Sequence, residues 1–100
     1  MKARMIALLN SFPTMPRKGI TDWSGDFVTL PKDGGGLLDA YRGCSSGEKR
    51  AIEFCLNVWN TETDWTEYGY RRFNLAHAIG IWDDKHRAAF LAWCHDPFFP

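Results

Sequence analysis

The chain has 100 residues, of which 45% are hydrophobic and 24% are charged. This composition is that of a folded globular domain, and it argues against a disordered chain. Twelve basic residues balance twelve acidic ones, so the chain lacks the strong positive charge that is typical of nucleic-acid binders. The length predicts a single globular domain over residues 1–100.

Cysteine usage and the lack of a long apolar run predict the compartment. Residues 5–9 form the only apolar run near the start, and this run is too short for a signal sequence or a membrane span. The three cysteines, Cys44, Cys55 and Cys94, cannot all pair within one chain. An odd number of cysteines without a signal sequence favours a reducing compartment. We therefore expect a cytoplasmic protein with no membrane contact.

The first twelve residues, MKARMIALLNSF, favour either a short helix or an edge strand, because five consecutive apolar residues do not separate the two by periodicity. We interpret them as a strand. Its partner would be residues 27–30, a β-branched and aromatic stretch that ends at Pro31. The expected fold class is a mainly α small helical domain, with α+β as the alternative if this short N-terminal β-hairpin forms.

Ser45 and Glu48 predict the start of a central helix at about residues 46–60. They stand three residues apart before an apolar run, which is the capping-box pattern. At roughly 100° per residue, the apolar side chains cover most of the helix circumference, so we expect the helix to be buried. The polar residues left to face solvent are Lys49, Arg50, Glu53, Asn57 and Asn60.

Shorter helices are expected on both sides of the central one. Residues 37–42 predict a helix that ends at Gly43 in the left-handed conformation. Asn74 predicts the start of a helix over 75–81, because an asparagine side chain can cap the first free N–H groups.

Asp83 and Asp84 predict the start of a C-terminal helix at about residues 84–94, where carboxylates cap free N–H groups and meet the positive end of the helix dipole. We expect its apolar face to pack against the central helix. The residues on that face are Trp82, His86, Ala89, Phe90 and Trp93.

His86 is the histidine with a candidate role, because an imidazole on an apolar face needs a hydrogen-bond partner. We interpret it as a core histidine that is bonded to a backbone carbonyl or a carboxylate. The alternative is a functional imidazole in a pocket with Cys55, Asp39 or Tyr41.

Cysteines and histidines could supply metal ligands or a catalytic thiol. None of the paired spacings of structural zinc sites occurs among Cys44, Cys55, Cys94, His86 and His95. Cys44 is the one credible reactive thiol, because it directly precedes a helix N-terminus, but no catalytic signature flanks it. We expect no cofactor, no metal and no catalytic residue; the alternative is a small Cys/His metal-binding protein or thiol enzyme.

Residues 65–72, WTEYGYRR, combine tryptophan, tyrosine and arginine, the residue types that dominate binding hot spots. The segment is expected in a loop, and a role in covering the core weighs equally with a role in binding. The same aromatic residues beside arginines could stack on single-stranded nucleic acid, which the zero net charge disfavours. The candidate partner-binding residues are Trp65, Glu67, Tyr68, Tyr70, Arg71 and Arg72.

An initiator methionine, one small domain and no catalytic signature give the chain a resemblance in type to the short proteins made by phages and plasmids. Many such proteins inhibit a host complex, and the resemblance implies an inhibitor of the anti-CRISPR or other anti-defence type. We therefore expect a small, non-enzymatic protein-interaction module whose partner is a protein. The sequence names neither that partner nor the oligomeric state.

Overall fold

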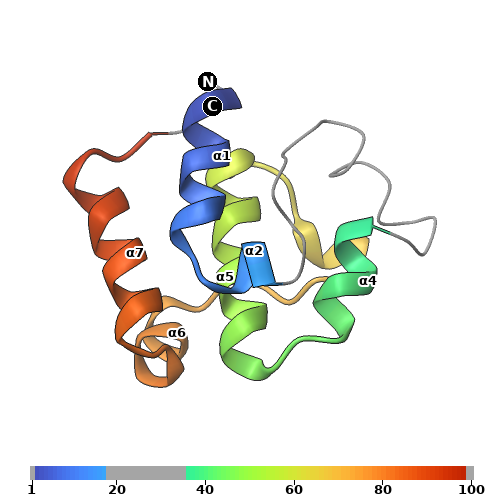
Figure 1. Ribbon diagram of the computed structural model, residues 1–100. Coiled ribbons are helices and arrows are strands. Elements are labelled where there is room, and N and C mark those ends of the chain that lie inside the picture. Colours follow the sequence, from blue (N-terminus) through green and yellow to red (C-terminus); the bar gives the residue numbers. More distant parts are fainter. Residues whose placement is uncertain (1, 18–35, 99–100) are drawn as a thin grey trace.

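The computed structural model describes residues 2–17 and 36–98 (Figure 1). Within these two ranges the chain forms helices and no strand, so the expected mainly α fold is confirmed. The helices are α1 (Lys2–Ser11), α2 (Thr14–Arg17), α4 (Gly36–Arg42), α5 (Ser46–Trp59), the 3₁₀ helix η2 (Trp65–Tyr68), α6 (Leu75–Ile81) and α7 (Asp84–His95).

The N-terminal segment is a helix, so its interpretation as a strand is wrong. The buried side chains of α1 and the turn after it are Met5, Leu8, Leu9 and Phe12. Their spacing of three, four and seven residues is that of one helix face. Phe12, beyond the apolar run, is the residue that reveals this period. The expected partner strand at 27–30 lies outside the described residues.

Helix α5 lies at the centre of the molecule, between α1 and α7 on one side and α4 on the other (Figure 1). The Ser45 hydroxyl accepts the Glu48 N–H at 3.4 Å, and the Glu48 carboxylate accepts the Ser45 N–H at 2.8 Å. The predicted capping box is therefore confirmed. The helix ends at Trp59, where the Asn60 N–H still bonds to the Leu56 carbonyl at 3.0 Å.

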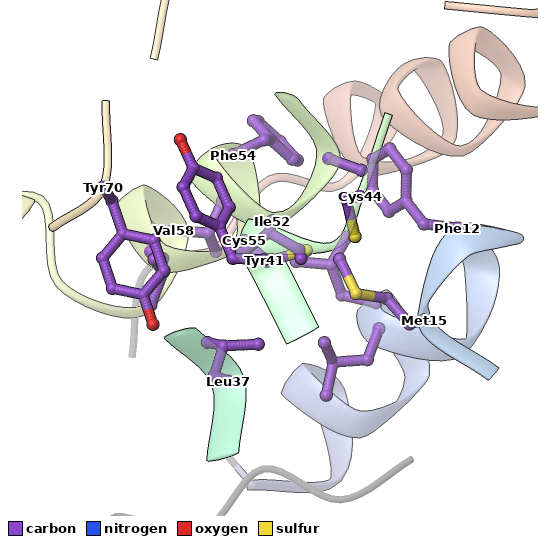
Figure 2. Packing of buried hydrophobic residues seen from close by; sticks show 14 of the residues in the cluster. Phe12, Met15, Leu37, Tyr41, Cys44, Ile52, Phe54, Cys55, Val58 and Tyr70 are labelled. Carbon is purple, nitrogen blue, oxygen red and sulfur yellow. The ribbon is translucent and has the colours of Figure 1, made fainter. Parts of the chain in front are cut away.

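Phe54 of α5 is surrounded by aromatic rings. Its centroid lies 5.2 Å from that of Trp93 and 5.3 Å from that of Phe90, both on α7. The expected packing of the aromatic face of α7 against the central helix is therefore confirmed. Figure 2 shows Phe54 in the same cluster as Phe12, from the turn after α1.

Arg50 and Glu53, which we expected to face solvent, are 2% and 1% exposed. The two side chains neutralise each other one helical turn apart: Arg50 Nε donates to Glu53 Oε1 at 2.6 Å, and Arg50 Nη2 donates to Oε2 at 2.5 Å. The periodicity argument failed because it treats every charged residue as exposed, whereas a hydrogen-bonded ion pair can be buried as a unit. Helix α5 is thus covered on more sides than its apolar residues indicate.

The helix starts that depend on side-chain caps agree with expectation. Asn74 Oδ1 accepts the His77 N–H at 3.0 Å at the start of α6, and Asp83 Oδ1 accepts the His86 N–H at 2.9 Å at the start of α7.

The expected left-handed conformation of Gly43 is wrong, because Gly69 is the one described residue with a positive φ, at 98°. The Gly43 N–H instead bonds three residues back along α4, and this tighter turn needs no positive φ.

Candidate protein-interaction surface

Two of the three cysteines are buried, and burial keeps their thiols from reacting with a substrate. Cys55 is buried in the core, and burial raises the pKa of its thiol far above the usual range. Cys44, expected to be the reactive thiol, is also buried, and its thiol donates to the Ala40 carbonyl at 3.1 Å. Cys94 is exposed near the end of α7. Across residues 2–17 and 36–98, no group of three or more His, Cys, Asp or Glu is placed to hold a metal ion.

His86 is a buried histidine with a carboxylate partner, as we expected. Its Nδ1 lies 2.7 Å from Asp83 Oδ1, and its Nε2 lies 2.6 Å from Thr14 Oγ1. Both ring nitrogens are thereby engaged, and neither engages Cys55, Asp39 or Tyr41, so the alternative pocket is wrong. The order hydroxyl, imidazole, carboxylate is that of a hydrolase triad. Thr14 is 0% exposed, however, so its hydroxyl is out of reach of a substrate.

The predicted segment 65–72 divides into anchors and exposed residues. Trp65 and Tyr70 are 7% and 3% exposed. The Trp65 indole donates to the Asn60 carbonyl at 3.1 Å, and the Tyr70 ring meets the Tyr41 ring edge-on with centroids 4.8 Å apart. These two side chains therefore attach the segment to α4 and α5, and a partner cannot contact their full faces.

The remaining predicted residues are accessible. Glu67, Arg71 and Arg72 are exposed, and Tyr68 is half-buried. The structure therefore brings three charged side chains of the predicted site to the surface.

A surface hollow of about 270 Å³ adjoins this segment. Within it, Asp64 begins η2 and accepts hydrogen bonds from the Thr66 N–H at 3.1 Å and from the Thr66 hydroxyl at 2.5 Å. These bonds, with a smaller contribution from the charge of Arg72, hold the pKa of Asp64 below its usual range. The lining residues are Asn57, Thr61, Glu62, Thr63, Asp64, Trp65, Thr66 and Arg72.

Residues 66–81 form one largely exposed stretch, which we call the 66–81 segment. Four of its side chains, Tyr68, Tyr70, Phe73 and Ala78, pack against the core. Tyr70 and Ala78 are buried, and the Phe73 ring packs 5.5 Å from Phe54 and 6.0 Å from Trp82. The first half of the segment exposes charged side chains, and the second half is α6.

Helix α6 exposes an apolar surface that the sequence analysis missed. Of its seven residues, LAHAIGI, only Ala78 is buried, and Leu75, Ile79 and Ile81 are 45%, 37% and 39% exposed. The composition of this stretch could have predicted the apolar surface, because His77 is the only polar residue of the helix. A helix without a polar face exposes apolar side chains wherever it is not covered.

Comparison of the chain with protein-family models, curated proteins and solved structures gives no match. The helices and the exposed residues described above define the chain as a small helical domain with an exposed, partly apolar 66–81 segment. None of the helices in the described part of the chain has the length and apolar character needed to cross a membrane.

Proposed function

We propose that the chain is a non-enzymatic protein-interaction module that contacts its partner through the 66–81 segment. The observation that carries the proposal is the exposure of Leu75, Ile79 and Ile81 on α6. Single exposed apolar residues are ordinary on a protein surface, but Leu75 and Ile79 stand four residues apart on α6 and therefore share one face of the helix, as neighbouring residues of an interaction patch do.

The charged first half of the segment supports the same function. Arg71 and Arg72 are exposed three or four residues before α6, and Glu67 precedes them. Interfaces commonly surround an apolar centre with a polar rim, and arginine is enriched in them. Because Trp65 and Tyr70 already fix the backbone here, less conformational entropy would be lost on binding.

The two alternative functions draw less support. A thiol enzyme would need an accessible, activated thiol. Cys44 and Cys55 are buried, and the exposed Cys94 lies near the C-terminal end of α7 and not at a helix N-terminus. A single-strand nucleic-acid binder would need exposed aromatic faces beside the arginines, whereas Trp65 and Tyr70 pack against protein.

The finer hypothesis is that the partner is a host complex, which the chain inhibits as a product of a phage or other mobile element. This part of the proposal rests only on the resemblance in type. The experiment that identifies the partner tests it as well, because recovery of a metabolic enzyme with unchanged activity would contradict inhibition of a defence complex.

The test is affinity purification from the source cells with the full chain as bait, read by mass spectrometry. The double variant Leu75→Asp/Ile79→Asp places two carboxylates on the α6 surface. The variant Leu91→Asp is the matched control, because Leu91 is 57% exposed but lies on α7. Both baits should keep the wild-type free energy of unfolding within about 0.5 kcal/mol, as substitutions at exposed sites usually do.

We expect a partner that the wild type and Leu91→Asp recover and that Leu75→Asp/Ile79→Asp loses. The second arm, Arg71→Glu/Arg72→Glu, should weaken recovery of the same partner. Equal recovery by all four baits would refute the 66–81 segment as the contact surface.

A further inference from the structure

Tyr41 of α4 makes two hydrogen bonds that join distant parts of the chain. Its buried hydroxyl donates to Glu53 Oε2 on α5 at 2.7 Å and accepts the Arg71 N–H at 3.1 Å. Figure 2 shows the Tyr41 side chain within the buried cluster, together with Tyr70. One hydroxyl therefore links the interior of the molecule to the backbone of the 66–81 segment.

The direction of these bonds follows from the charges around them. Both carboxyl oxygens of Glu53 accept hydrogen bonds from Arg50, and Oε2 also accepts the bond from the Tyr41 hydroxyl. Burial, followed by the hydrogen bond to Glu53, raises the pKa of the Tyr41 hydroxyl, so the hydroxyl keeps its proton. With that proton directed at Glu53, the oxygen lone pairs remain for the Arg71 N–H.

We propose that Tyr41 is a positioning residue for the partner-binding surface, and that its hydroxyl couples the buried Arg50–Glu53 ion pair to the backbone at Arg71. This inference rests on the proposed function, because it gives Tyr41 a role in presenting Arg71 and Arg72. The side chains of both arginines are exposed. Their positions therefore depend on how the backbone is held, and the bond from the Arg71 N–H to Tyr41 helps to hold it.

The neighbouring tyrosine provides a matched control. Tyr70 is also buried and its ring packs edge-on against Tyr41, but its hydroxyl has no hydrogen-bond partner among the described residues. Tyr41→Phe and Tyr70→Phe therefore remove the same atom from adjacent rings. Only the first change removes the links to Glu53 and Arg71.

The first measurement is amide hydrogen exchange by NMR on the full chain. A net hydrogen bond of ordinary strength corresponds to an exchange rate on the order of five-fold faster when the bond is lost. We expect that acceleration at the Arg71 amide in Tyr41→Phe and no acceleration there in Tyr70→Phe. The Asn60 amide, bonded to the Leu56 carbonyl, serves as the reference, so general destabilisation is distinguished from a local change.

The second measurement is the affinity of both variants for the recovered partner. We expect Tyr41→Phe to weaken binding by a factor similar to the change in exchange rate, and Tyr70→Phe to leave the affinity unchanged. Unchanged Arg71 exchange relative to Asn60, or equal acceleration in both variants, would overturn the coupling. Faster exchange with unchanged affinity would overturn the positioning role. If Arg71→Glu/Arg72→Glu and Leu75→Asp/Ile79→Asp both leave partner binding intact, the proposed surface fails whatever the exchange data show.

Discussion

Replacing Glu53 with alanine is expected to be among the most destabilising single changes in the described part of the chain. Arg50 and Glu53 are both buried, and the strongest contacts of the guanidinium are its two bonds to the carboxylate. The variant leaves Arg50 with a long contact to the Ser46 hydroxyl at 3.4 Å. Removing one partner of a buried ion pair typically costs about 3–5 kcal/mol, because the other charge is left uncompensated. The total free energy of unfolding of a native protein is only about 5–15 kcal/mol.

Urea unfolding followed by tryptophan fluorescence and far-UV circular dichroism would measure this loss. Unfolding free energies of small proteins fall by about 1–3 kcal/mol per molar urea, so the Glu53→Ala midpoint should fall by roughly 2 M. The double variant Arg50→Met/Glu53→Leu removes both charges and keeps apolar volume. It should regain at least half of the loss, because replacing a whole buried pair by apolar residues is often neutral or stabilising.

Two results would refute this reasoning. A cost below about 1 kcal/mol for Glu53→Ala would mean that the pair behaves as an exposed one. A double variant no more stable than Glu53→Ala would mean that an uncompensated guanidinium is not the cause of the destabilisation.

Three further predictions concern accessibility and backbone conformation. An aromatic disulfide reagent should label Cys94 rapidly in the folded protein and label Cys44 and Cys55 only after unfolding; rapid labelling of Cys44 would contradict its burial. Gly69→Ala should cost roughly 1–2 kcal/mol in urea unfolding, because φ is 98° and the added Cβ would lie 3.2 Å from a leucine of α4. Gly80→Ala, where an added Cβ meets nothing within 4 Å, should instead stabilise α6 by about 0.5–1 kcal/mol, and a loss there would contradict the open environment.

The features that the sequence predicted well are local ones. The capping box of Ser45 and Glu48 and the caps Asn74 and Asp83 each depend on residues within one helical turn, so a pattern of three or four residues suffices. The central position of α5 also followed, because the number of apolar residues on it leaves little surface for solvent.

The features that the sequence did not predict depend on contacts between distant residues. The buried Glu53 carboxylate accepts a hydrogen bond from Tyr41 of α4, and this contact depends on tertiary packing. For Trp65 and Tyr70, hot-spot composition alone did not separate a core anchor from an exposed contact.

The ring cluster around Phe54 has a consequence for how the chain folds during synthesis. Its aromatic neighbours on α7 are made some forty residues after Phe54 itself, so α5 leaves the ribosome with its most apolar side uncovered. The N-terminal Phe12, 5.7 Å away by ring centroids, is the early neighbour that can shield it. Until α7 emerges, the nascent chain exposes these apolar side chains, and chaperones can bind them.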